Sequence, residues 1–175
     1  NGRVIPAGPL RGPLDFQLGL ADAIVVNAAA EGAGEQMAEW LRHRFKGAVL
    51  RSNTVVAGDA QWIRGQRVVA WAGIGAPTRF FAMLGALDAE LIESVPFRDH
   101  QHLSQADADR LLLLARERQA VLVSTEKDLA RLKGSMGACA ELAAATRALP
   151  IKVHFAEPDA ERLRALVDSA LQARI

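Results

Sequence analysis

The sequence predicts an α/β fold, a small Rossmann-like parallel sheet flanked by helices. From residue 67 onward, short apolar segments alternate with helical segments, a pattern typical of parallel sheets with helical crossovers. Capping residues and prolines fall where the helices should begin. Half of the 175 residues are hydrophobic, which suffices for one core and a small appendage.

The amino-terminal part predicts an irregular loop, a strand and a helix. Prolines and glycines make 4–14 a stiff, irregular loop. The β-branched run at 23–27 predicts a buried strand, and the small, polar segment 28–34 predicts a loop. Apolar residues at spacings of three and four predict a helix over 35–45.

Two further strands, 47–56 and 60–68, flank the turn signal Gly58-Asp59, and we expect them to form an antiparallel, two-stranded hinge. This pair is the predicted domain boundary. The expected division is 1–46, 47–66 and 67–175.

The carboxyl-terminal domain is predicted to alternate strands and helices. Its expected strands are 67–72, 90–95, 120–124 and 151–155. Its expected helices are 77–87, 105–118, 127–133, 138–148 and 158–173. Ser104 with Asp107, and Thr125 with Asp128, fit capping boxes.

Composition excludes some partners. With 21 basic and 20 acidic residues the net charge is +1, which gives no support for a nucleic-acid-binding surface. No apolar run approaches the ~20 residues that span a bilayer. A single cysteine, Cys139, fits a reducing compartment.

The segment Gly73–Thr78 follows a predicted strand and contains two glycines before Pro77. Ligands of open α/β sheets gather at the carboxyl ends of strands. The segment could therefore hold a nucleotide or an anion at the helix start, with Arg79 nearby. A tight strand-to-helix turn without a ligand explains the same residues.

The run Asp99-His100-Gln101-His102 follows the next predicted strand. A carboxylate beside an imidazole can orient it and tune its proton affinity, so catalysis is one interpretation. A His-x-His metal arm and ordinary loop polarity are the others. Cys139 and His154 show no metal-ligand spacing with this pair, so we expect no metal site.

Ser124–Asp128 lies at the end of another predicted strand. Lys127 could meet a phosphate there, with Asp128 positioning it. Helix capping by Thr125, with Lys127 solvated, is the alternative. Arg3 and Arg11 flank a stiff loop and could bind phosphate as guanidinium forks, or be ordinary surface arginines.

Four segments together resemble one enzyme family. They are NGRVIPAGPLR at 1–11, VVAWAGIGAPTRFF at 68–81, PFRDH at 96–100 and STEKD at 124–128. They resemble the tetraacyldisaccharide 4'-kinases of lipid A synthesis, over the carboxyl-terminal half of that family. We therefore expect part of a longer enzyme, and the initial Asn instead of Met agrees with truncation.

The resemblance implies a lipid kinase that moves the γ-phosphate of ATP, with Mg²⁺, onto the 4'-hydroxyl of a lipid A disaccharide precursor. It implies peripheral work at the cytoplasmic face of the bacterial inner membrane. Residues 1–46 would be a remnant of a P-loop kinase domain. His100 would support a catalytic aspartate of the amino-terminal half across an interdomain cleft, and Asp99 would orient His100.

The implied enzyme needs a phosphate loop, and no Gly-x-x-x-x-Gly-Lys-Ser/Thr segment occurs in the chain. We expect ATP and Mg²⁺ to be bound mainly by the missing amino-terminal kinase domain, and these 175 residues alone to be inactive. A stand-alone α/β module that binds a nucleotide or anion, and a purely structural interaction domain, are the alternatives.

Overall fold

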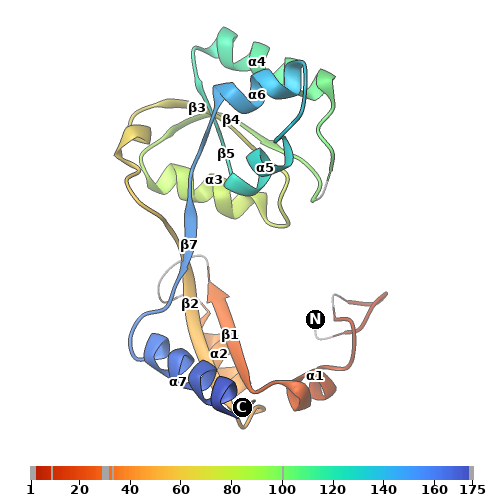
Figure 1. Ribbon diagram of the computed structural model, residues 1–175, viewed down its shortest axis with the longest axis vertical. Helices are drawn as coiled ribbons and strands as arrows, with labels where there is room; N and C mark the ends of the chain where they lie inside the picture. Colours follow the sequence, from red (N-terminus) through yellow and green to blue (C-terminus); the bar gives the residue numbers. More distant parts are fainter. Residues whose placement is uncertain (1–2, 9, 29–31, 33, 100, 174–175) are drawn as a thin grey trace. The chain divides into compact units, whose positions relative to one another are not determined.

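The computed structural model describes residues 3–8, 10–28, 32, 34–99 and 101–173. The chain forms two compact units (Figure 1). The first unit is made of residues 1–55 and 153–175, and the second of residues 56–152.

The second unit is built on a four-stranded parallel sheet in the order β4-β3-β5-β6. The strands are β3 (Arg67–Ala72), β4 (Glu90–Pro96), β5 (Val121–Ser124) and β6 (Thr146–Ala148). The helices of this unit are α3 (Pro77–Ala86), α4 (Gln105–Arg118), α5 (Glu126–Arg131) and α6 (Ala138–Ala145). The predicted α/β fold with a parallel sheet flanked by helices is confirmed.

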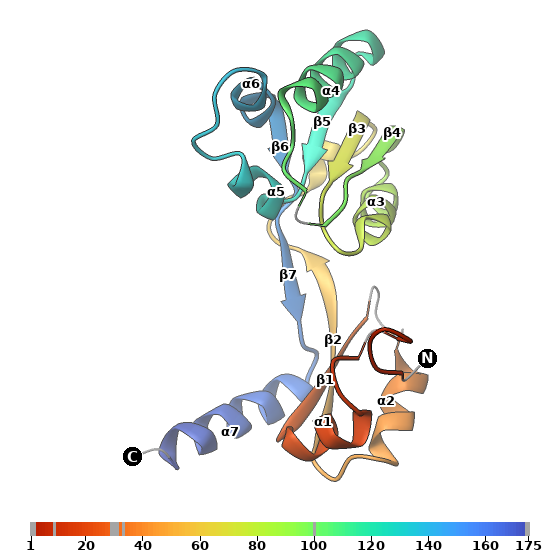
Figure 2. The same cartoon turned by 90° about the vertical axis from the view of Figure 1, so that its right-hand side faces the viewer.

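Helices cover both faces of this sheet, and β3 shows why. Val69 and Trp71 pack into one core with side chains of α4 and α6. Val68 and Ala70 point the other way, into a second core with α3, since successive side chains of a strand alternate between faces. β3 is therefore buried on both sides, as its continuous apolar sequence requires. Figure 2 shows α3 and α4 on opposite sides of the strands.

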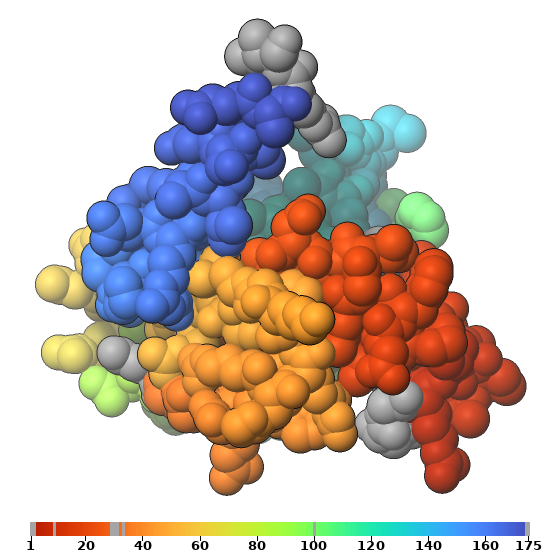
Figure 3. Space-filling model, turned by 90° about the horizontal axis from the view of Figure 1, so that it is seen from below, coloured from red at the N-terminus to blue at the C-terminus, as the bar shows by residue number. Residues whose placement is uncertain are grey.

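The other sheet has three strands in the order β1-β2-β7 and belongs mainly to the first unit. Its strands are β1 (Ala23–Ala28), β2 (Ala48–Val56) and β7 (Ile151–His154), and its helices are α1 (Leu14–Leu20), α2 (Glu35–Arg42) and α7 (Asp159–Gln172). A small core forms around Ala38, Leu41 and Val49. Figure 3 shows the orange region of α2 beside the red-orange region of α1, with blue α7 on its other side.

Polar contacts fix α2 and α7 to β2 in the first unit. The buried Asp159 carboxylate accepts the Arg51 backbone N–H at 2.9 Å. The Arg51 guanidinium pairs with Glu35 at the start of α2. A hydrogen bond from Arg42 lowers the pKa of Glu35, and the bonds to Glu39 and Glu35 raise the pKa of Arg42. Trp40 on α2 is 41% exposed, with the Arg44 guanidinium 4.5 Å from its ring centre.

The antiparallel pair expected from 47–56 and 60–68 does not form. β2 runs parallel to β1, in a register that matches Ala23 with Ala48, and Gln61–Ile63 is a short 3-10 helix, η1. The expected strand over 60–68 merges the η1 turn with the start of β3. Ile63 is apolar and buried, as a strand residue would be, but it belongs to η1 and packs into the core beside α3.

Three other features differ from what the sequence led us to expect. Residues 14–20 form helix α1, which was not predicted. The helix expected to end at 148 ends at Ala145, and Thr146–Ala148 becomes β6 through pairing with β5. The last strand, β7, lies in the first unit's sheet beside β2 and not in the carboxyl-terminal sheet. For β6 and β7, pairing with strands that are distant in the sequence decides the outcome.

The capping box at the start of α4 is confirmed. Ser104 Oγ accepts the Asp107 N–H at 3.1 Å, while the Asp107 carboxylate accepts the Ser104 N–H at 3.2 Å and its hydroxyl at 2.7 Å. The hydroxyl hydrogen bond lowers the pKa of Asp107. A carboxyl whose pKa is lower in the folded state stabilises it above the usual value of about 3.9, and this contribution disappears as the pH falls through the folded value.

Asp107→Asn is therefore expected to cost about 1 kcal/mol of unfolding free energy at pH 7. The difference from the parent should shrink as the pH drops below about 4, because the parent carboxyl then becomes neutral too. Urea unfolding at several pH values measures this. Asp109→Asn, two residues along the same helix, is the control and should change stability by less than about 0.5 kcal/mol. A gap between Asp107→Asn and parent that stays constant with pH would contradict the prediction.

Candidate functional site

The carboxyl ends of β3, β4 and β5 meet at one rim of the second unit's sheet. Gly73 follows β3, Asp99 follows β4, and Thr125 follows β5 and caps α5. Adjacent parallel strands bring their ends together, and this is where α/β proteins place their ligands. The rim therefore gathers polar groups from three distant stretches of sequence.

Asp128 is the centre of this rim. Its side chain is 3% exposed, and Oδ2 accepts the Gly73 N–H at 3.2 Å and the Thr125 hydroxyl at 2.7 Å. The Asp128 N–H donates to Thr125 Oγ1 at 3.2 Å. Half of the expected capping box is thus present, but the carboxylate turns to Gly73 instead of the Thr125 N–H. Asp128 joins the start of α5 to the end of β3.

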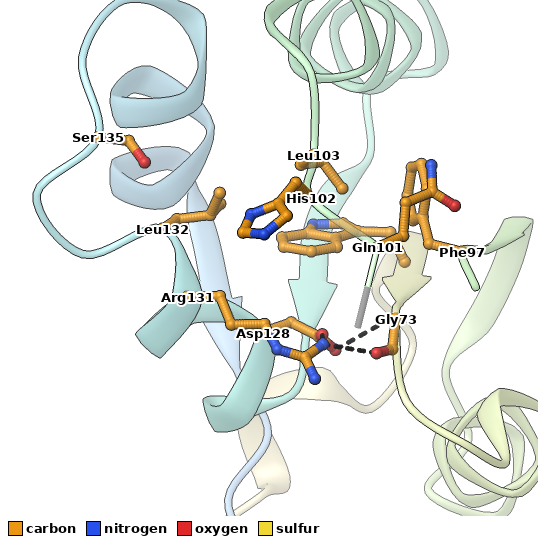
Figure 4. A pocket seen from close by; sticks show the side chains of 10 residues that line it. Gly73, Phe97, Gln101, His102, Leu103, Asp128, Arg131, Leu132 and Ser135 are labelled. Carbon is orange, nitrogen blue, oxygen red and sulfur yellow. Dashed lines mark hydrogen bonds and ion pairs between the residues drawn. The ribbon is translucent and has the colours of Figure 1, made fainter. Parts of the chain in front are cut away.

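Arg131 continues the connection. Its Nη1 donates to the Gly73 carbonyl at 2.6 Å and lies 3.0 Å from Asp128 Oδ1, while Nη2 lies 3.7 Å from Asp99 Oδ1. Figure 4 shows the Arg131 and Asp128 side chains converging on Gly73. One guanidinium thus contacts groups that follow β3, β4 and β5. A buried carboxylate requires such a partner, because an unpaired buried charge is costly.

Asp99 is shared by two cations. Lys127 Nζ lies 3.7 Å from the same Oδ1 that faces Arg131. The Lys127 and Asp99 side chains are 54% and 41% exposed, so solvent weakens this contact. Lys127, Arg131, Asp99 and Asp128 together have a net formal charge of zero. These four residues therefore create no excess positive charge for an anion.

Of the two glycines in the Gly73–Thr78 segment, Gly73 lies in a tight place, whereas Gly75 has only an ordinary contact with Asp99. A Cβ at Gly73 would lie 3.3 Å from Asp128 Oδ1, and one at Gly75 would lie 3.6 Å from Asp99 Oδ2. Asp99 and the glycine turn thus share a rim. The Gly73 N–H, which a nucleotide phosphate would need, already donates to Asp128. This favours the interpretation of a tight turn.

A cavity of about 320 Å³ opens beside this network. Its walls are about half apolar, around Trp71, Phe97 and Leu103, and half polar, with His102, Asp128 and Arg131 among the polar members. Trp71 and Phe97 meet edge to face, with ring centres 6.4 Å apart, and the Trp71 indole donates to Thr146 Oγ1 at 3.3 Å. The cavity is near the lower limit for small-molecule sites.

The remaining predicted site residues lie elsewhere or outside the described residues. Arg3 and Arg11 belong to the first unit, where Val4 and Leu10 bridge the loop between them and the Ile5 N–H donates to the Leu10 carbonyl at 2.8 Å. Both arginines are exposed. His100 lies outside the described residues; its sequence neighbour Asp99 is on the rim.

The described residues gather no group of three His, Cys, Asp or Glu side chains suited to a metal ion. No helix within the described ranges has the length and apolar character needed to cross a bilayer.

Comparison with known proteins identifies the family. Residues 1–172 match the family described as Tetraacyldisaccharide-1-P 4'-kinase. The chain belongs to this family. The resemblance found in the sequence is thereby confirmed.

Individual members of the kinase family match nearly the whole chain. A tetraacyldisaccharide 4'-kinase from Chelativorans sp. is 35% identical over 173 residues, covering 99% of this chain and 49% of that protein. One from Methylobacterium nodulans is 40% identical over 166 residues, covering 94% and 46%. The chain thus spans about half the length of these relatives.

A solved structure shares the fold. The crystal structure of an "apo" form of LpxK from Aquifex aeolicus in complex with ATP has a TM-score of 0.58 and 22% identity to this chain. The match covers 96% of this chain and 48% of that one.

Sequence reasoning missed Arg131. The spacing of Arg131 from Asp128 could have indicated an ion pair, because residues three apart lie side by side on a helix. The sequence does not say that this pair turns inward onto Gly73, since that contact joins residues 58 positions apart.

Proposed function

We propose that this chain supplies the carboxyl-terminal half of a lipid kinase. The enzyme would transfer the γ-phosphate of ATP to the 4'-hydroxyl of tetraacyldisaccharide 1-phosphate in lipid A synthesis. The observation that carries the proposal is the family match over residues 1–172. The Asp99-bearing rim at the carboxyl ends of the strands supports it.

The transfer has simple chemical requirements. A bond forms between the 4'-oxygen and the γ-phosphorus, and the bond from that phosphorus to the β,γ-bridging oxygen breaks, so that ADP leaves. The proton of the 4'-hydroxyl passes to a base. Such reactions depend on positioning and charge stabilisation, so the enzyme needs a base and phosphate-binding cations.

The chain has residues suited to both roles. His100 would support the base, and Asp99 would orient the His100 imidazole, since a carboxylate beside a histidine fixes its tautomer. Arg3, Arg11 and Lys127 would contact phosphate oxygens. Lys127 would then have to exchange its contact with Asp99 at 3.7 Å for a phosphate.

The remaining parts would come from outside the chain. The Gly73 N–H is already bonded to Asp128, and the described residues hold no cluster of magnesium ligands. ATP and Mg²⁺ would therefore be bound mainly by the amino-terminal half, where Mg²⁺ would neutralise charge on the transferred phosphate. The enzyme would work as a peripheral protein at the cytoplasmic face of the inner membrane.

The test compares the full-length protein with these 175 residues. The full-length protein is expected to transfer ³²P from labelled ATP to tetraacyldisaccharide 1-phosphate, and the 175-residue chain is expected to show no transfer. Absence of activity in the full-length protein would refute the proposed function. Transfer by the short chain would refute the assignment of essential parts to the other half.

A nucleotide titration of the 175-residue chain separates the kinase half from a stand-alone binding module. Because the turn amide at Gly73 is occupied, we expect no micromolar affinity for ATP. Calorimetry measures this directly, with the full-length protein as the positive control. Micromolar binding by the short chain would favour the module.

A further inference from the structure

The Arg131 guanidinium holds together three strand ends, and this role goes beyond the proposed site residues. It contacts the Gly73 carbonyl after β3, the Asp99 carboxylate after β4 and the Asp128 carboxylate after β5. We propose that Arg131 is a positioning residue for the reaction: it fixes Asp99, the carboxylate that would orient the catalytic imidazole in the proposed function. The inference rests on the proposed function.

The geometry favours a guanidinium over any other cation. Nη1 serves Gly73 and Asp128 at 2.6 and 3.0 Å, while Nη2 faces Asp99 at 3.7 Å. A guanidinium is planar and offers donors in a rigid fork, whereas an ammonium is a single point charge on a flexible stem. Lysine at this position would offer one ammonium in place of the two separate nitrogens that face Gly73 and Asp99.

Of the two carboxylates that Arg131 contacts, Asp128 is more buried than Asp99. The Asp128 side chain is 3% exposed and the Arg131 side chain 28%, while that of Asp99 is 41% exposed. Asp128 is itself held by the Gly73 N–H and the Thr125 hydroxyl. The guanidinium is thus fixed at its inner end and presents Nη2 to a more exposed carboxylate. Functional side chains are held in a precise position when the residues that contact them are themselves fixed by hydrogen bonds and packing.

The contact of Lys127 with Asp99 differs in kind. Lys127 Nζ reaches the same oxygen at the same distance of 3.7 Å, but its side chain is 54% exposed. Among the described contacts it makes none with Gly73 or Asp128. Lys127 therefore adds charge at Asp99, while Arg131 adds both charge and a fixed direction.

The test uses the full-length enzyme. Arg131→Ala is expected to lower kcat by roughly 10- to 100-fold, with KM for ATP and for the disaccharide unchanged, because misplacement weakens only the transition state. Millimolar guanidinium chloride should restore kcat in a saturable way, whereas methylammonium chloride at equal concentration should not. Arg131→Lys should not restore it. Lys133→Ala, just beyond α5, is the matched control and should behave like the parent.

Backbone hydrogen exchange of the same proteins gives a readout independent of activity. Peptides covering 96–104 should exchange faster in Arg131→Ala than in the parent or in Lys133→Ala. A kcat unchanged in Arg131→Ala would overturn the inference, as would a fall that follows a lower melting temperature and is not restored by guanidinium. If the parent enzyme lacks kinase activity, the proposed function fails, while the exchange comparison still tests whether Arg131 holds this segment.

Discussion

In the full-length protein, His100→Ala is expected to lower kcat by roughly 100- to 10,000-fold, the usual contribution of acid–base assistance. KM for both substrates should change little, because the imidazole would act on a proton that moves only in the transition state. Asp99→Asn, which keeps the shape and removes the charge, should lower kcat less. Steady-state kinetics at saturating ATP and disaccharide give the values.

The sequence supplies a matched control for this experiment. His102→Ala removes the same side chain two residues along the same segment. Because His102 lines the cavity beside Leu103 and has no place in the proposed transfer, its kcat should stay close to that of the parent. An unchanged kcat in a stably folded His100→Ala protein would remove His100 from the reaction, and an equal loss in both variants would point to a general disturbance of the segment.

The largest expected loss of stability is at Asp128. Asp128→Ala leaves the Gly73 N–H without its acceptor and the partly buried Arg131 guanidinium without its closest carboxylate. Removing one partner of a buried pair costs about 3–5 kcal/mol, and the partial exposure of Arg131 lowers the expected cost to about 2–3 kcal/mol. Urea unfolding of the 175-residue chain measures this difference.

Glu126 is the natural comparison, because it lies in the first turn of the same helix but is exposed. Glu126→Ala loses only a favourable interaction with the helix dipole, worth less than about 1 kcal/mol. Equal losses of unfolding free energy in Asp128→Ala and Glu126→Ala would contradict the prediction. They would mean that Asp128 stabilises only the start of α5 and that its hydrogen bond with Gly73 adds no stability.

The periodic apolar segments made most of the second unit predictable. β3, β4, β5 and α4 lie within one or two residues of their expected bounds, because each carries its own burial pattern and its own turn or cap signal. β6 could not be predicted in this way. Its three residues continue an alanine-rich helix in the sequence, and only pairing with β5 makes them a strand.

The first unit was less predictable for a related reason. β2 carries the apolar residues of a strand, but nothing local says whether its partner is β1 or the segment that follows. The turn signal at Gly58-Asp59 pointed to a hairpin, whereas the actual partners are β1, which precedes it across α2, and β7, roughly a hundred residues later. Strand pairing at such distances leaves little trace in a single sequence.

The rim shows the same limit at the level of side chains. Asp99, Lys127 and Asp128 were recognised as polar residues at strand ends, and parallel sheets bring such ends together. Which of them would be exposed and which buried was not predictable. Thr125 and Asp128 read equally well as an ordinary helix cap, and the inward turn of Asp128 depends on the space that Gly73 leaves for its carboxylate.

The chain enters and leaves the second unit at adjoining points, since the Ala57 N–H donates to the Pro150 carbonyl at 2.9 Å. A folded segment whose two ends lie next to each other resembles a domain inserted into a loop of another domain. We therefore expect that this segment can be expressed alone, or exchanged for the equivalent segment of a relative. Recombination could replace residues 56–152 in the same way, and the residues at the rim of the sheet, including Asp99 and Asp128, would be replaced together.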